Sequence, residues 1–261
     1  MPTALIAGGP TRPDGWLMRV MADALPGWSV RPATLRRTAR ADALVIAGAT
    51  TFATVRAPLP VLSRTTALVL AASARGLPIA FVGVGAGPLD GRIARALART
   101  LVRAADLLVV TEEGSGELLA RAGAPAPFRI GAELRWAVPA PPRHAATTAT
   151  TDAIVSTDPS ELVAAALAGV PFVAVECEPR TTALARRLGQ HRVAPWATEH
   201  AVAAARARAT HEPPAPPAAV RGEIEAARRS LTLLRLLLSG GTSEAAGAVT
   251  GLDLHPEPWA A

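Results

Sequence analysis

The stretch GVGAGPLDGRIARALARTLVRAADLLVVTEEGSGELLARAG, residues 83–123, decides the fold class of this chain. After glycines at every second position, its pattern predicts an amphipathic helix over 91–105, a strand over 106–112 and a second helix over 115–123. Apolar residues recur at helical spacing in the helices, whereas the strand is a continuous apolar run. Such a strand is buried on both faces, so its alternation with helices predicts a parallel sheet covered by helices.

The same alternation extends from this stretch in both directions. Further predicted strands cover 3–9, 28–34, 41–49, 78–87 and 127–134, and further predicted helices cover 15–25 and 62–76. Together these elements predict a doubly wound, Rossmann-like α/β lobe over residues 1–137.

A second, smaller lobe is expected after a linker. Residues 138–151, VPAPPRHAATTATT, lack apolar periodicity and are rich in proline, alanine and threonine, which is typical of a linker. Two or three short strands then alternate with helices over 152–239, and the last helix runs from about Ala218 to Ser239. We expect a reduced α/β lobe there and an irregular tail over 240–261.

The charge of the chain is spread along its helices. All 27 basic residues among the 261 are arginines, and the formal net charge is +6. The arginines stand beside acidic residues in the predicted helices, whereas a nucleic-acid-binding protein needs a concentrated basic face. We therefore expect no nucleic-acid partner.

Cysteine and histidine usage argues against a disulfide framework or a metal centre. Cys177 is the single cysteine, and the five histidines show no metal-ligand spacing. The N-terminus lacks the basic region of a signal peptide, and Arg75 and Pro78 interrupt the most apolar window. We expect a cytoplasmic protein with no integral membrane segment, no cofactor and no metal. A homo-oligomer is compatible with the sequence.

The first candidate site follows the first predicted strand, at the edge where open α/β sheets collect ligands. Gly8, Gly9 and Asp14 lie in GGPTRPDGW, where backbone N–H groups before a helix can bind phosphate. The alternative is a tight turn with Asp14 capping the next helix.

The glycines Gly83, Gly85 and Gly87 end the strand predicted over 78–87. A spacing of two places them on one face of the strand, where the missing side chains admit either a ligand or a closely packed neighbour. Taken alone the pattern favours packing, and Gly85 and Gly87 are the candidates for ligand contact.

Acidic and hydroxyl residues follow the next predicted strand. Ser115 fits the N-cap of the helix over 115–123, which accounts for it without a ligand. Glu112 and Glu113 are neighbours whose side chains point in different directions, so their adjacency does not make a catalytic pair. Glu112 and Ser115 are candidates for substrate contact at this edge.

The second lobe has its own candidates at two helix starts. Asp158, Ser160 and Glu161 open the helix before AGVP. Free N–H groups at a helix start bind phosphates or ribose, but Asp158 would repel a phosphate, and Asp and Ser are also strong N-caps. Arg180 precedes the next helix and can bind an anion bidentately.

Three segments together resemble the polysaccharide pyruvyl transferase family: ADALVIAGAT at 41–50, GLPIAFVGVGAGPLDG to LLARAG at 76–123, and TDAIVST to RRLG at 151–189. The second segment is the most specific, and the resemblance covers most of residues 1–190. It implies a GT-B-like fold with two lobes. It also implies transfer of a pyruvyl group from phosphoenolpyruvate to a sugar of a cell-wall polysaccharide or exopolysaccharide.

The resemblance also implies partners and site residues. An anionic donor and a saccharide acceptor are expected, with Arg180 at a basic position of the family and Gly48 in a turn where the family has three glycines. Asp158 and Ser160 occupy the positions of the family's Arg-x-His and are therefore the catalytic candidates. Thr111 replaces a family arginine. The substrate-binding candidates are Gly8, Gly9, Asp14, Gly48, Gly85, Gly87, Glu112, Ser115, Glu161 and Arg180.

Two other functions stay open on the same residues. One is a GT-B glycosyltransferase-like enzyme that uses a nucleotide-sugar, with the helix at Ser160 holding the nucleotide. The other is a non-catalytic paralogue that acts as a binding or scaffold subunit, because the Arg-x-His pair is absent.

Overall fold

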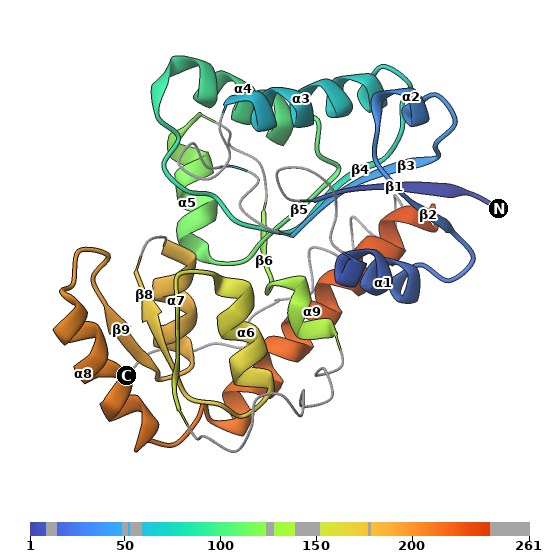
Figure 1. Cartoon of the computed structure of the whole chain (residues 1–261). Coiled ribbons are helices and arrows are strands. Elements are labelled where there is room, and N and C mark those ends of the chain that lie inside the picture. The colour runs from blue at the N-terminus through green and yellow to red at the C-terminus, as the bar shows by residue number, and fades with distance from the viewer. Residues whose placement is uncertain are drawn as a thin grey trace. The chain divides into compact units, whose positions relative to one another are not determined.

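The computed structural model describes residues 1–8, 15–48, 52, 59–123, 128–138, 152–176 and 179–240. The chain forms two compact units, one of Met1–Leu134 with Ala226–Ala261 and one of Arg135–Glu225. We call these unit 1 and unit 2. Each contains a parallel β-sheet with helices (Figure 1).

The sheet of unit 1 has six strands in the order β2-β1-β3-β4-β5-β6, and all neighbouring strands are parallel. The strands are β1 (Thr3–Ala7), β2 (Ser29–Pro32), β3 (Ala43–Ala47), β4 (Ile79–Val84), β5 (Leu107–Val110) and β6 (Arg129–Ile130). This confirms the predicted α/β class and the Rossmann-like parallel sheet. The strand order reverses between β1 and β3, because the chain first adds β2 on one side of β1 and then β3 on the other.

Helices cover both faces of this sheet (Figure 1). The helices of unit 1 are α1 (Gly15–Ala24), α2 (Leu35–Thr38), α3 (Leu59–Ser73), α4 (Gly91–Arg103), α5 (Glu113–Arg121) and the later part of α9 (Pro217–Leu238). Helices α3, α4 and α5 share one apolar cluster with one face of the sheet, while α1 and α9 lie at the other face. Every residue of β3 and β4 is buried, as the continuous apolar runs predicted.

An aspartate directly precedes β3 and another directly precedes β5. Each aspartate hydrogen-bonds a residue at the start of the neighbouring strand. The Asp42 carboxylate accepts a 2.8 Å hydrogen bond from the Thr3 N–H, and the Asp42 N–H donates to the Thr3 carbonyl at 2.9 Å. Asp106 makes the same pair of bonds with Ile79, at 2.8 and 2.9 Å. The Ala-Asp pair before each strand therefore sets where the pairing of the strands begins.

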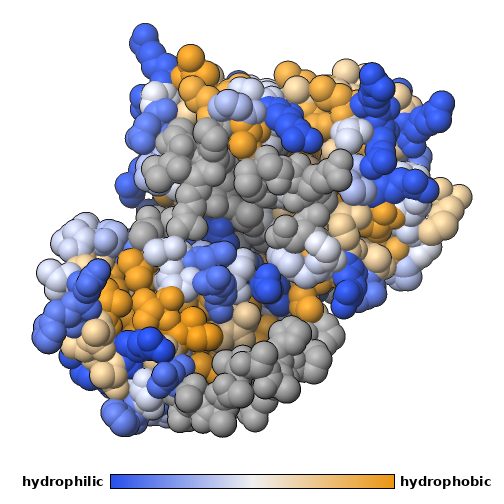
Figure 2. Space-filling view, in the orientation of Figure 1, coloured by the Kyte–Doolittle hydropathy of each residue, from blue (hydrophilic) through white to orange (hydrophobic). Residues whose placement is uncertain are grey.

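Helix α4 is strongly amphipathic. It buries Ala94, Ala98 and Leu101 in the cluster shared with the sheet, and its arginines are exposed. Hydrophilic side chains project along the margin of the surface beside α4 and α5 in Figure 2. The sequence pattern of small apolar residues alternating with arginine is thus the pattern of a helix lying flat on a sheet.

Unit 2 has a three-stranded parallel sheet in the order β7-β8-β9. Its strands are β7 (Ile154–Ser156), β8 (Phe172–Val175) and β9 (His191–Val193), and its helices are α6 (Pro159–Leu167), α7 (Pro179–Arg187), α8 (Glu199–Thr210) and the first part of α9. A 3₁₀ turn, η1 (Leu134–Ala137), lies where unit 1 passes into unit 2. Strands and helices alternate here as predicted.

Helix α9 belongs to unit 1 from Ala226 onward. There the Arg235 guanidinium donates hydrogen bonds to the carbonyls of Asp23 and Ala24 at the end of α1. A Cβ added to Gly131 would lie 2.3 Å from the Ser230 hydroxyl and 2.7 Å from a Val109 methyl group. Glycine at position 131 therefore allows α9 to approach the end of the sheet closely.

Candidate functional site

The carboxyl edge of the six-stranded sheet collects most of the candidates of the first lobe. Gly8 follows β1 and Gly48 follows β3, so they flank the point where the strand order reverses. Open α/β sheets bind ligands at this point, outside the carboxyl ends of the strands. Gly48 has a φ of +65°, which favours glycine. Gly9 and Asp14 lie outside the described residues.

The glycines after β4 are engaged by the protein itself. Gly83 has a φ of +63° at an irregularity in the pairing of β4 with β5, and an added Cβ would lie 2.9 Å from Leu134 Cγ. The Gly85 carbonyl accepts from the Phe52 N–H at 3.3 Å, and the Gly87 N–H donates to the Phe52 carbonyl at 2.8 Å. Close packing therefore accounts for Gly83, and the Gly87 N–H is already used within the chain.

A buried polar cluster lies beside these glycines, where β5 passes into α5. The Ser115 hydroxyl accepts a 2.7 Å hydrogen bond from the Ala86 N–H. The Glu112 carboxylate accepts hydrogen bonds from the hydroxyls of Thr111 and Ser115. Glu112 is only 7% exposed, and Ser115 is fully buried. The tertiary structure thus brings the loop after β4 and the start of α5 into one hydrogen-bonded group.

The expected capping role of Ser115 is wrong. Helix α5 begins at Glu113 and its N-cap residue is Glu112, so Ser115 lies inside the first turn. Its hydroxyl instead accepts a hydrogen bond from the Ala86 N–H in the loop after β4. The argument about adjacent glutamates is confirmed, because Glu112 is buried whereas Glu113 is exposed.

At the start of α6 in unit 2, the polar side chains hydrogen-bond one another and cap the helix. The Asp158 side chain caps α6 by accepting a 2.9 Å bond from the Ser160 N–H. The Ser156 hydroxyl accepts from the Asp158 N–H at 2.9 Å and donates to the Glu161 carboxylate at 2.5 Å. Asp158, Ser160 and Glu161 therefore lie together at the carboxyl end of β7, and each takes part in ending that strand or starting that helix.

The second helix start of unit 2 differs, because it holds buried polar groups. Arg180 lies in the first turn of α7 and is only 6% exposed. The next residue, Thr181, is fully buried, and its hydroxyl has no hydrogen-bond partner in the described part of the chain. A buried hydroxyl without a partner is uncommon and indicates a group that a ligand or water would satisfy. Thr181 was not predicted from the sequence. The one sequence signal for it is its position directly after Arg180.

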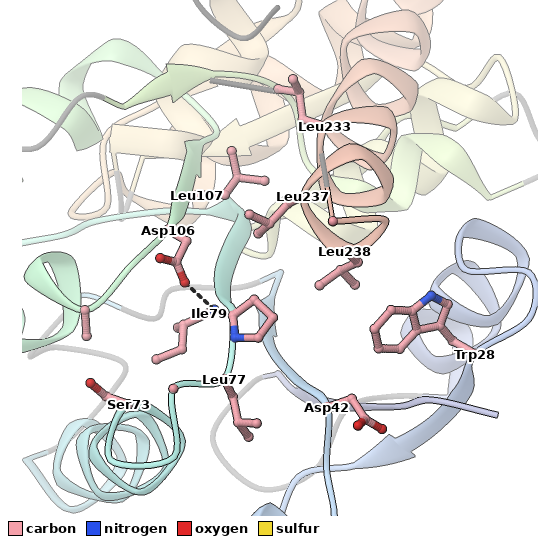
Figure 3. Close-up of a pocket in the computed structure, with 14 residues that line it drawn as sticks. Trp28, Asp42, Ser73, Leu77, Ile79, Asp106, Leu107, Leu233, Leu237 and Leu238 are labelled. Carbon is pink, nitrogen blue, oxygen red and sulfur yellow. Dashed lines mark hydrogen bonds between the residues drawn. The ribbon is translucent and has the colours of Figure 1, made fainter. Parts of the chain in front are cut away.

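A cavity of about 640 Å³ lies at the opposite, amino edge of the sheet of unit 1 (Figure 3). Trp28, Asp42, Asp106 and leucines of α9 contribute to its lining. Asp42 and Asp106 directly precede strands and bind backbone N–H groups, and Figure 3 shows the bond from Ile79 to Asp106. None of the candidate site residues lines this cavity, so the cavity is separate from the candidate site.

No protein-family model matches the chain, and no curated protein matches it. No helix in the described ranges is long and apolar enough to cross a membrane. Among the described residues, no three His, Cys, Asp or Glu side chains lie close enough together to hold a metal ion.

Proposed function

We propose that the chain is a GT-B-like member of the polysaccharide pyruvyl transferase type, which transfers a pyruvyl group from phosphoenolpyruvate to a saccharide. The Rossmann-like sheet of unit 1 and the smaller parallel sheet of unit 2 support this proposal, as do the three segments that resemble the family. The observation that carries it is the start of α7, where the buried Arg180 is followed by the buried Thr181, whose hydroxyl has no partner in the described part of the chain.

The start of α7 suits the anionic donor. The first N–H groups of a helix lack intrahelical partners and carry partial positive charge. A buried guanidinium binds carboxylate or phosphate with two parallel hydrogen bonds. The Thr181 hydroxyl adds a donor that the described protein atoms do not use. Phosphoenolpyruvate carries both a carboxylate and a phosphate, so it matches this set of donors.

The candidates at the start of α6 act on the sugar acceptor. The Asp158 carboxylate at the start of α6 takes the proton of an attacking sugar hydroxyl, and Ser160 hydrogen-bonds the sugar. The sugar oxygen bonds to C2 of the donor while the methylene carbon takes up a proton. A second sugar hydroxyl then bonds to C2 and displaces phosphate, which leaves a pyruvyl ketal on the sugar.

Thermal unfolding with phosphoenolpyruvate, UDP-sugars and GDP-sugars tests the proposal. Phosphoenolpyruvate is expected to raise Tm, and Arg180→Gln is expected to abolish the rise. Arg186→Gln is the matched control, because Arg186 is exposed in the last turn of the same helix. A rise with nucleotide-sugars alone would replace pyruvyl transfer by glycosyl transfer. No rise with any donor would exclude both enzymes.

A non-catalytic binding subunit is the second candidate, and the capping network around Asp158 favours it. The Ser156 hydroxyl hydrogen-bonds both Asp158 and Glu161, and the Asp158 carboxylate accepts from the Ser160 N–H. Asp158 and Ser160, at the positions of the family's Arg-x-His, are thus part of a capping network. The double substitution Asp158→Arg with Ser160→His restores the family pattern. If the chain is a degenerate relative, the restored protein will gain a Tm rise with phosphoenolpyruvate that the original lacks.

A further inference from the structure

Four arginine side chains surround a hollow on the surface of unit 1. Three of them project from α4, and the fourth comes from the last turn of α5. The hollow has a volume of about 410 Å³. Its lining consists of Arg92, Arg95, Arg99, Arg121, Ala122 and Gly123. Four arginines from two helices therefore lie around one hollow in the folded chain.

Helical spacing brings the first three arginines together. Arg92, Arg95 and Arg99 are separated by three and four residues, so they lie on one face of α4. The opposite face is fixed on the sheet, because Ala94 and Ala98 are completely buried. The arginine face of α4 therefore cannot turn away from α5 without removing these alanines from the core.

Contacts within the protein hold two of the guanidinium groups in place. Arg95 Nε donates to the Gly91 carbonyl at 3.4 Å. Arg121 forms an ion pair with Glu117 at 3.1 Å, one turn earlier on α5. Exposed ion pairs add little stability, but they restrict the positions that a long side chain occupies.

Gly123 leaves space for the side chain of Arg99 at the end of α5. Its φ of +79° ends the helix, and its N–H donates to the Ala120 carbonyl at 2.9 Å. A Cβ at this position would lie 3.3 Å from Arg99 Cδ. The glycine thus leaves room for the stem of Arg99 to lie across the end of the helix and reach the hollow.

The hollow has a strong excess of positive charge. Among the described residues, Glu117 is the one carboxylate that pairs with any of the four arginines. Guanidinium groups gathered in this way repel one another, and a bound anion removes the repulsion. The N-cap residue of α4 is Asp90, whose negative charge offsets the partial positive charge of the helix N-terminus beside Arg92.

We propose that this hollow binds a soluble, multiply charged phosphate compound. Arginine is the side chain best suited to phosphate, because its planar fork donates two parallel hydrogen bonds to two oxygens. Several guanidinium groups around one hollow suit a ligand with more than one phosphate group, which engages them together. The site shares no residue with the proposed pyruvyl transfer site, and it stands independently of that function.

Calorimetric titration with inorganic pyrophosphate at constant ionic strength tests this site. We expect saturable binding at one site per chain, weakened about tenfold for each guanidinium removed in Arg95→Gln and Arg99→Gln. Arg103→Gln is the matched control, because Arg103 is exposed on the same helix and does not line the hollow. Circular dichroism and thermal unfolding of each variant exclude loss of the fold.

Three outcomes would overturn the proposal. One is the absence of saturable pyrophosphate binding by the unaltered protein. Another is equal weakening by Arg103→Gln and Arg99→Gln, which would indicate a general effect of net charge. The third is binding to phosphatidylglycerol vesicles without binding to pyrophosphate, which would indicate a membrane surface. Arg95→Gln and Arg99→Gln are expected to keep the rise in Tm with phosphoenolpyruvate, so failure of this site is distinguishable from failure of the proposed function.

Discussion

The Ser115 hydroxyl accepts a 2.7 Å hydrogen bond from the Ala86 N–H and thereby connects the first turn of α5 to the end of β4. The same hydroxyl donates to the Glu112 carboxylate. Both of its partners are buried within one part of the carboxyl edge of the sheet. Ser115 is therefore the residue on which the local geometry of this edge depends.

Ser115→Ala is expected to lower the free energy of unfolding by about 2 kcal/mol or more, because it leaves a buried N–H and a buried carboxylate without this partner. Urea denaturation measures the change. Ser63→Ala is the control, since Ser63 is exposed on α3 and its loss is expected to change stability by less than about 0.5 kcal/mol. If the two substitutions change the free energy of unfolding equally, the hydrogen bond to Ala86 does not stabilise the fold.

Gly116→Ala and Gly114→Ala form a matched pair within α5. A Cβ at Gly116 would lie 2.2 Å from the Phe128 ring, whereas a Cβ at Gly114 meets nothing within 4 Å. Overpacking is expected to make Gly116→Ala destabilising by about 1–3 kcal/mol. Gly114→Ala is expected to stabilise by about 0.5–1 kcal/mol, because alanine favours a helix. Thermal unfolding of both variants measures the two changes in stability. Changes of the same sign would contradict the packing of Phe128 on α5.

Asp106→Ala removes the acceptor of the Ile79 N–H at the start of β4. We expect a loss of about 1–2 kcal/mol, and a smaller loss for Asp106→Asn, because asparagine keeps an acceptor oxygen. Amide hydrogen exchange gives a local readout: the Ile79 N–H should exchange faster in Asp106→Ala. Unchanged exchange at Ile79 would show that the carboxylate does not protect this strand end.

The ion pair of Arg187 with Glu223 connects α7 to α9 within unit 2, with the closest atoms 2.5 Å apart. Glu223 is only 8% exposed, so Arg187→Ala would leave a buried carboxylate without its partner. We expect a loss of about 3 kcal/mol, and a much smaller change when Arg187→Met is combined with Glu223→Leu. Denaturant unfolding of the single and double variants measures this.

The exposed pair of Arg121 with Glu117 is the control for that measurement. Its side chains are 76% and 54% exposed, so Glu117→Gln is expected to change stability by less than about 1 kcal/mol. If the Arg187→Met, Glu223→Leu double variant is as unstable as Arg187→Ala, the charge pair itself stabilises unit 2, and the loss in Arg187→Ala does not come from a buried carboxylate without its partner.

Thr181→Val replaces the unpartnered hydroxyl of α7 by a methyl group of similar size. Without ligand the variant is expected to gain about 1 kcal/mol of stability, because a buried polar group without a partner is removed. In the presence of phosphoenolpyruvate the rise in Tm should shrink. Thermal unfolding with and without the donor measures both changes, and lower stability without ligand would show that the hydroxyl has a structural partner.

The sequence predicted most elements of the fold because their signals are local. The run LVIAG predicts a buried strand, and the structure places β3 at Ala43–Ala47. The pattern around Gly91–Arg103 predicts an amphipathic helix and is one. Strand ends were predicted too long, as with 78–87 against Ile79–Val84, because apolar residues continue into loops that the ladder of hydrogen bonds does not include.

The candidate site was less predictable, because it depends on which groups meet across the sheet. The glycines after β4 could serve a ligand or a neighbour by their spacing alone, and only the contacts with Leu134 and Phe52 show what Gly83 and Gly87 do. Ser115 looked like a cap because capping is a local rule, whereas its partner Ala86 lies 29 residues away. Nothing in the sequence marks the hydroxyl of Thr181 as unpartnered.

Sequence alone determined the α/β class and the parallel sheet, since apolar periodicity and continuous apolar strands are properties of neighbouring residues. Tertiary structure decided the strand order β2-β1-β3-β4-β5-β6, the hydrogen bond from Ala86 to Ser115, and the approach of Arg121 on α5 to the three arginines on α4. These features depend on contacts between residues far apart in the chain, and such contacts exist only once the helices are packed on the sheet.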